Sequence, residues 1–103
     1  MKTPDCCLTL SFPHALEEHI VDHLLDHPEW VDGFSTVQIE GHGRMHEEST
    51  AAELVRGRAG RRYAQLVLEH DDARVLLDQL RADLPSDEIA YWITPVLEFG
   101  RFA

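Results

Sequence analysis

The hydrophobic residues of the chain recur at two spacings, one typical of helices and one typical of strands, and segments of the two kinds alternate along the sequence. Two segments, 14–27 and 70–84, carry apolar residues at the three-to-four-residue spacing of amphipathic helices. Four shorter runs combine alternation with β-branched and aromatic residues, which indicates strands: 6–12, 34–40, 63–69 and 88–93. The apolar residues expected to face the core are Cys6, Leu8, Leu10 and Phe12 of the first strand, Leu16, Ile20, Val21, Leu24 and Leu25 of the first helix, and Ala73, Leu76, Leu77, Leu80 and Leu84 of the second.

The order of these elements predicts an α+β fold. Strand, helix, strand, long loop, strand, helix and strand are the two halves of a split βαβ, or ferredoxin-like, sandwich. We expect one four-stranded antiparallel sheet with two helices on one face, within a single domain over residues 1–103. An extra C-terminal strand is expected over 94–99, where Pro95 favours an edge or a bulge.

The second face of this sheet is predicted to lie in an interface. It would carry Cys7, Thr9 and Val67, and is too apolar to be left wholly in water. We therefore expect it to pack against other copies of the chain, with the aromatic-rich C-terminal tail helping to close the contact.

The net charge and the lengths of the apolar runs argue against nucleic acid as a partner and against insertion into a membrane. The formal net charge is -10 at pH 7, which argues against nonspecific nucleic-acid binding, because such binding needs many cations to neutralise phosphates. No apolar run reaches membrane-spanning length, and the first residues lack the basic and apolar regions of a signal peptide. A cytoplasmic protein that is not inserted into a membrane is expected.

The segment between strands two and three collects the positive charge. Five of the nine Lys and Arg residues and four of the six glycines lie between Gly41 and Tyr63. Arg44 follows a Gly-x-Gly turn, from which a guanidinium can reach a phosphate while backbone amides come close. The segment thus predicts a site for an anion or an acidic partner surface. The alternatives are a solvated loop without a ligand, and an Arg44 that pairs with Glu40 or Glu47.

Two parts of this loop, together with the order of elements, resemble the PII signal-transduction superfamily. The run 41–45, Gly-His-Gly-Arg-Met, corresponds to the Gly-aromatic-Gly-Arg-Gln that opens the PII T-loop. The run 53–57, Glu-Leu-Val-Arg-Gly, corresponds to Glu-Leu-Tyr-Arg-Gly. Met45 replaces the glutamine that helps PII proteins bind magnesium and 2-oxoglutarate, and Val55 replaces a tyrosine that some PII proteins have modified. The connection 84–87 also lacks the glycine-rich phosphate loop.

The chain is accordingly similar to the divergent PII-like branch encoded beside heavy-metal efflux pumps, and more distantly to the CutA proteins. This resemblance implies a homotrimer with a T-loop at about 42–60 and a ligand cleft between subunits. An adenine nucleotide is the effector class that it implies, with a membrane transporter or efflux pump as the partner docked by the T-loop. The ligand-binding residues would be Gly41, Gly43 and Arg44, with Arg61 or Arg62 in place of a phosphate-contacting lysine.

The histidines suggest a second hypothesis, a transition-metal-binding protein of heavy-metal tolerance or sensing. His19 and His23 stand one helical turn apart, a spacing that can chelate a transition metal, and His27 continues the line. His42 and His46 flank Arg44 and Met45 in the loop, and histidine with methionine suits a soft metal. The alternatives are a polar helix flank and a solvated loop.

Enzyme motifs are absent from the sequence. It has no Walker loop, no HExxH and no glycine elbow around a serine, so a catalytic role is not expected. The adjacent Cys6 and Cys7 would point to opposite faces of a strand and not bond each other, which leaves their role open.

Overall fold

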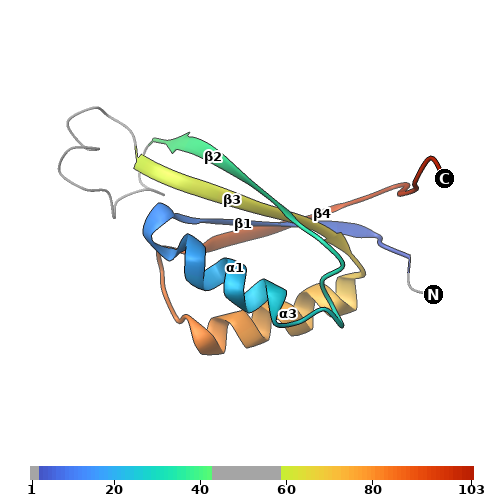
Figure 1. Cartoon of the computed structure of the whole chain (residues 1–103), viewed down its shortest axis with the longest axis horizontal. Helices are drawn as coiled ribbons and strands as arrows, with labels where there is room; N and C mark the ends of the chain where they lie inside the picture. The colour runs from blue at the N-terminus through green and yellow to red at the C-terminus, as the bar shows by residue number, and fades with distance from the viewer. Residues whose placement is uncertain (1–2, 43–58) are drawn as a thin grey trace.

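The computed structural model describes residues 3–42 and 59–103 (Figure 1). Along this part of the chain the elements are β1 (Cys6–Pro13), the 3₁₀ turn η1 (His14–Leu16), α1 (Glu17–Leu25), β2 (Ser35–Gly41), β3 (Ala59–Leu68), α3 (His70–Asp83) and β4 (Ala90–Pro95).

The strands form one antiparallel sheet in the order β2-β3-β1-β4, and both helices lie on the same face of it (Figure 1). The predicted ferredoxin-like sandwich is confirmed. The two central strands, β1 and β3, pair from Cys6 opposite Leu68 to Pro13 opposite Arg61. In an antiparallel pair, opposed residues share a face, so this register decides which side chains meet on each side of the sheet.

The core lies between the sheet and the helices. The four β1 residues predicted to face inward are buried, and so are Ala73, Leu76, Leu77 and Leu80 of α3. The α1 prediction holds for Ile20 and Leu24, which are buried, and fails for Leu25, which is exposed. Leu25 lies at the last position of α1, past the stripe that faces the sheet.

The sheet face away from the helices is not covered by any described element (Figure 1). It carries the alternate residues of each strand: Cys7, Thr9 and Ser11 of β1, Arg61, Tyr63, Gln65 and Val67 of β3, Ser35, Val37 and Ile39 of β2, and Trp92 and Thr94 of β4. Tyr63 and Trp92 meet edge to face at 5.3 Å between ring centroids. We call this surface the open face.

Two sequence-based boundaries are corrected by the structure. The strand expected from residue 63 begins at Ala59, so the connection after β2 is shorter at this end than the expected T-loop at about 42–60. The extra C-terminal strand expected over 94–99 does not form: β4 runs to Pro95, which pairs with the first residue of β1, Cys6, and no strand follows it. The tail keeps one backbone bond to the segment before β1, from the Val96 amide to the Asp5 carbonyl.

The sandwich has two distinct ends. Both termini lie at one end, and the connection between β2 and β3 leaves from the other (Figure 1).

In the part of the chain that the structure describes, no helix has the length and apolarity that a membrane crossing requires.

Candidate functional site

The candidate anion site lies at the base of the connection between β2 and β3. Gly41 ends β2 and is paired with Ala59, the first residue of β3. Gly41 is buried, while His42 just beyond it is exposed. The pairing holds the two ends of the connection side by side at this end of the sheet.

Arg61 is a cation that the described part of the fold places at this base. Its side chain lies on the open face, and the residue is only 3% exposed. The guanidinium donates to Ser11 Oγ, at 3.4 Å from Nε and 3.2 Å from Nη2, and Nη2 also donates to the Glu88 carbonyl oxygen at 2.9 Å. Arg61 thereby joins three segments: the start of β3, the end of β1 and the loop before β4.

Arg61 is a buried cation that gives its hydrogen bonds to neutral oxygens, with the charge of Glu88 nearby. Burial lowers the pKa of its guanidinium, and the nearby charges of Glu88 and Tyr63 act in the opposite direction. An arginine remains protonated in proteins, so this buried charge has lost part of its hydration. An anion placed beside the guanidinium would offset that loss.

Arg62, the other arginine considered for a phosphate contact, lies on the opposite face. Its Nε is 3.5 Å from Glu17 Oε2 at the start of α1, and its Nη1 donates to the Arg61 carbonyl at 3.1 Å. Successive residues of a strand point to opposite sides of the sheet, so the two neighbours cannot serve one site. The structure therefore favours Arg61 for the anion site and gives Arg62 an ion pair with α1.

The other loop residues of the prediction lie outside the described residues. These are Gly43, Arg44 and His46, together with Met45. Their part in ligand or metal binding stays a prediction.

Sequence reasoning missed the two partners of Arg61. Ser11 occupies an ordinary polar position of an alternating strand, and nothing in its neighbours marks it. The contact from Glu88 is made by its backbone carbonyl, which carries no sequence signal at all.

The helical histidines converge on a single carboxylate. Nε2 of His19 and Nδ1 of His23 each lie 3.1 Å from Oδ2 of Asp83, at the last residue of α3. These contacts hold the pKa of Asp83 below its usual value, the hydrogen bond from His23 contributing most. His27 instead bonds Glu29 at 2.9 Å and stacks on Trp30.

This cluster gives the histidines a structural partner. Among residues 3–42 and 59–103, no group of three His, Cys, Asp or Glu side chains is arranged to hold a metal ion. Nε2 of His23 is buried and, within the same residues, has no hydrogen-bond partner. A metal held by His19 and His23 stays a prediction, and such a metal would have to displace their bonds to Asp83.

Comparison with solved structures places this fold among PII-like proteins. A DUF3240 family protein from Shewanella baltica OS155 superposes with a TM-score of 0.77 at 22% identity, covering 98% of this chain and 99% of that one. CPII from Thiomonas intermedia K12, a nitrogen regulatory PII-like protein bound to ADP, AMP and bicarbonate, gives 0.69 at 18% identity, with 98% of each chain covered.

A putative PII-like signalling protein from Thermus thermophilus gives a TM-score of 0.64 at 15% identity, covering 93% of this chain and 90% of that one. At these identities the likeness shows the fold alone. A search among curated proteins found no match.

The family is decided by the match of a family model along the chain. The model described as "Protein of unknown function (DUF3240)" matches residues 2–103, which is nearly the whole sequence. The chain belongs to the DUF3240 family, and its fold is that of PII-like proteins.

Proposed function

We propose that this chain is a regulatory protein that binds an anionic effector, of the adenine-nucleotide class, beside Arg61 at the base of the connection between β2 and β3. Arg61 carries the proposal. It is a guanidinium 3% exposed on the open face, and it bonds a hydroxyl and a carbonyl oxygen where a phosphate would supply a full negative charge. The solved structure of CPII bound to ADP, AMP and bicarbonate supports this choice of effector class.

The site is suited to signalling because a ligand bound there would act on two loops, the connection between β2 and β3 and the loop before β4. Arg61 lies next to the connection that begins after Gly41 and also holds the loop at Glu88. A ligand that draws the guanidinium away from the Glu88 carbonyl changes the contacts of both segments. An effector acts only through its different affinity for the two arrangements, so this exchange of partners is the switch.

The open face supports a homotrimer as the working assembly. Val37 is an exposed apolar side chain of β2 on that face, and Tyr63 and Trp92 form an aromatic pair on it. Covering this surface with neighbouring subunits would bury it and bring a second chain to each Arg61 site. The partner that receives the signal, a membrane transporter or efflux pump in our prediction, would dock on the connection.

Calorimetric titration with ATP, ADP and AMP tests the anion site. Replacing Arg61→Gln removes the charge and should weaken nucleotide binding by about tenfold or more, as expected for the loss of a hydrogen bond between two charged groups. Arg62→Gln is the matched control, because it removes the same group from the opposite face. Equal affinities for both variants, or no binding of any of the three nucleotides to the wild type, would overturn the proposal.

A further inference from the structure

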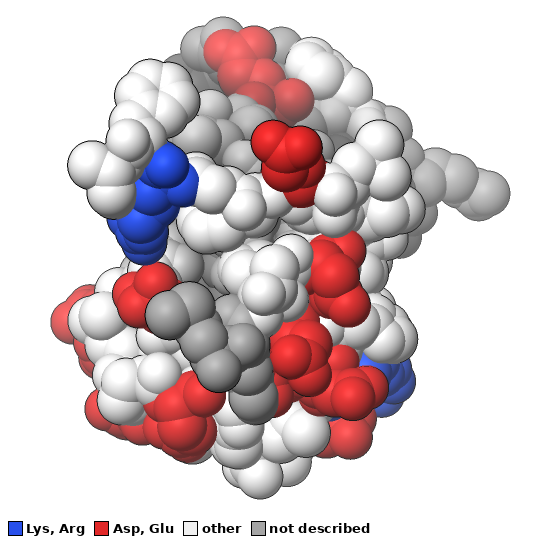
Figure 2. Space-filling model, turned by 90° about the vertical axis from the view of Figure 1, so that its right-hand side faces the viewer, with Lys and Arg blue, Asp and Glu red and all other residues white. Residues whose placement is uncertain are grey.

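The part of the chain that the structure describes contains five arginines, at positions 61, 62, 74, 81 and 101. They belong to a strongly acidic molecule, and the surface at the end that holds both termini shows far more acidic than basic side chains (Figure 2). Opposite charges attract over several ångströms, so an arginine in such surroundings readily finds a carboxylate. An arginine without one is therefore a candidate for binding an anionic ligand.

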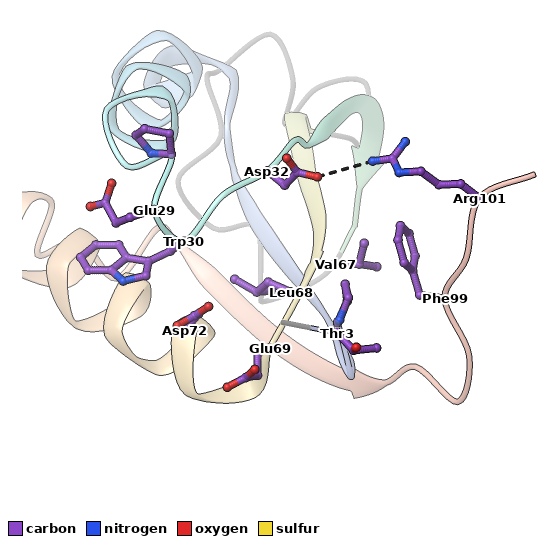
Figure 3. A pocket seen from close by; sticks show the side chains of 12 residues that line it. Thr3, Glu29, Trp30, Asp32, Val67, Leu68, Glu69, Asp72, Phe99 and Arg101 are labelled. Carbon is purple, nitrogen blue, oxygen red and sulfur yellow. Dashed lines mark hydrogen bonds and ion pairs between the residues drawn. The ribbon is translucent and has the colours of Figure 1, made fainter. Parts of the chain in front are cut away.

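Three of the five arginines already have partners. Arg61 gives its hydrogen bonds to neutral oxygens, Arg62 has its ion pair with α1, and Arg101 Nη2 lies 3.4 Å from Asp32 Oδ2. Figure 3 shows the Arg101 pair beside a cavity of about 470 Å³ at the termini end. We call it the acidic cavity, because four carboxylates line it, those of Glu29, Asp32, Glu69 and Asp72.

The remaining two, Arg74 and Arg81, lie on α3 and converge on Tyr91 of β4. Both arginines are exposed, and their separation of seven residues, two helical turns, places them on the same side of α3. The guanidinium carbon of Arg81 is 6.0 Å from the centre of the Tyr91 ring. Hydrogen bonding by Arg74 and by Arg81 lowers the pKa of the Tyr91 phenol. Two guanidinium groups thus face one phenol oxygen.

Tyr91 lies at the outer edge of the sheet. It pairs with Leu10, a core residue, so its side chain is on the helix side of edge strand β4 and not on the open face. The residue is 39% exposed, which makes it accessible to a ligand from solvent. Arg61 lies on the other side of the sheet, where it bonds the carbonyl of Glu88. The two groups of cations therefore form separate sites.

An acidic residue of α3 stands between the two arginines in sequence. Asp78 is four residues after Arg74 and three before Arg81, a spacing at which helical side chains can pair. Among the described arginines, however, those in ion pairs with carboxylates are Arg62 and Arg101. Within the described residues, the charges of Arg74 and Arg81 are thus not compensated by a direct ion pair.

We propose that Arg74, Arg81 and the hydroxyl of Tyr91 bind a phosphate group, either the free ion or an ester. A phosphate accepts hydrogen bonds through several oxygens, and the planar fork of an arginine matches two of them. The phenol O–H donates a further bond. The exposed position leaves room for an organic group carried by the phosphate. The protein then has a second anion site, which does not depend on the proposed nucleotide site.

An NMR titration that follows the ring signals of the tyrosines tests this site. The chain has two tyrosines, Tyr63 and Tyr91, so one Tyr→Phe variant assigns both signals. Inorganic phosphate should shift the Tyr91 signal in a saturable way, beyond the change that sodium chloride causes at equal ionic strength. Arg74→Gln and Arg81→Gln should each raise the dissociation constant about two- to fivefold, the effect of one exposed ion pair. The double variant should lose saturation.

Glycerol phosphate is the second probe, and it distinguishes the two sources of the phosphate group. Tighter binding of the ester than of inorganic phosphate would assign the site to a phosphorylated small molecule. The reverse order would assign it to the free ion. A site for the phosphate group should bind both probes, and the same two arginines should be required for each.

Three further variants serve as controls. Asp78→Asn should lower the dissociation constant about twofold, because it removes a negative charge beside both arginines. Arg101→Gln, at an exposed arginine of the tail, should leave the Tyr91 shift unchanged. Arg61→Gln should also leave it unchanged, which separates this test from that of the nucleotide site. A Tyr91 shift that chloride reproduces, or one that persists in the double variant, would show that the arginines hold no phosphate.

Discussion

At the scale of single residues, the pleat of β3 gives two adjacent arginines different roles. Arg61 reaches across the open face to Ser11 and the Glu88 carbonyl, while Arg62 points to the helices and meets Glu17. Both were equally good phosphate ligands from sequence. Their difference is one of burial and partners: Arg62 has a carboxylate at ion-pair distance, whereas Arg61 is more deeply buried, gives its hydrogen bonds to neutral oxygens and has its burial offset only in part by the charge of Glu88.

Arg61 should also matter for stability without any ligand. Arg61→Ala removes two hydrogen bonds to the hydroxyl of Ser11, a residue that is 1% exposed, and one to the Glu88 carbonyl. We expect the free energy of unfolding to fall by about 1–3 kcal/mol, the usual cost of an unsatisfied buried group. Urea denaturation measures this. Arg101→Ala removes one exposed ion pair and should cost about 0–1 kcal/mol. A similarly small loss for both variants would contradict the burial argument.

At the scale of elements, the histidine line of α1 is a clamp on α3. His19 and His23 share one oxygen of Asp83, so the two helices are joined at the last residue of α3 in addition to their apolar contacts. Sequence reasoning found the spacing of His19 and His23 on one helix face. It could not find Asp83, because a partner 60 or 64 residues away is brought near only by the packing of two helices on the sheet.

This clamp predicts an acid-sensitive contribution to stability. The pKa of Asp83 is lowered from its ordinary value of 3.8, so its stabilising effect is present above that pH and is lost as the pH falls through the lower folded-state pKa. The difference in unfolding free energy between wild type and Asp83→Asn should therefore shrink on acidification below pH 3.8.

Urea denaturation over a pH series measures this difference. Asp87→Asn, at an exposed position in the following loop, is the control and should show no such trend. A difference for Asp83→Asn that stays constant down to the lowest pH would rule out the clamp.

At the scale of the whole molecule, the two ends of the sandwich differ in charge, and one face of the sheet is not covered by helices. The termini end carries the acidic cavity, the other end carries Arg61, and the open face exposes the apolar side chain of Val37 on edge strand β2. An antiparallel sheet can leave one face in water, but apolar and aromatic side chains gathered on that face are the mark of an interaction surface. This is the physical basis of the proposed trimer.

Sedimentation velocity tests that assembly with a matched pair of substitutions. Val37 on the open face is 42% exposed and Val75 on α3 is 41% exposed, so neither belongs to the core of one chain. The wild type should sediment as a trimer. Val37→Asp should shift it toward the monomer, because a buried unpaired charge in the interface is costly, and Val75→Asp should not. A monomeric wild type would remove the assembly from the proposed function.

The sequence alone carried the periods of the strands and helices, their order and the inward set of β1, because these depend on local spacing and on which side chains avoid water. It also located the arginine-rich segment between β2 and β3 and the two runs in it that resemble the PII T-loop. Only the folded chain separated Arg61 from Arg62, brought Asp83 to His19 and His23, and ended the sheet at Pro95. Each of these depends on contacts between residues far apart in sequence, and only the register and packing of the sheet bring such residues together.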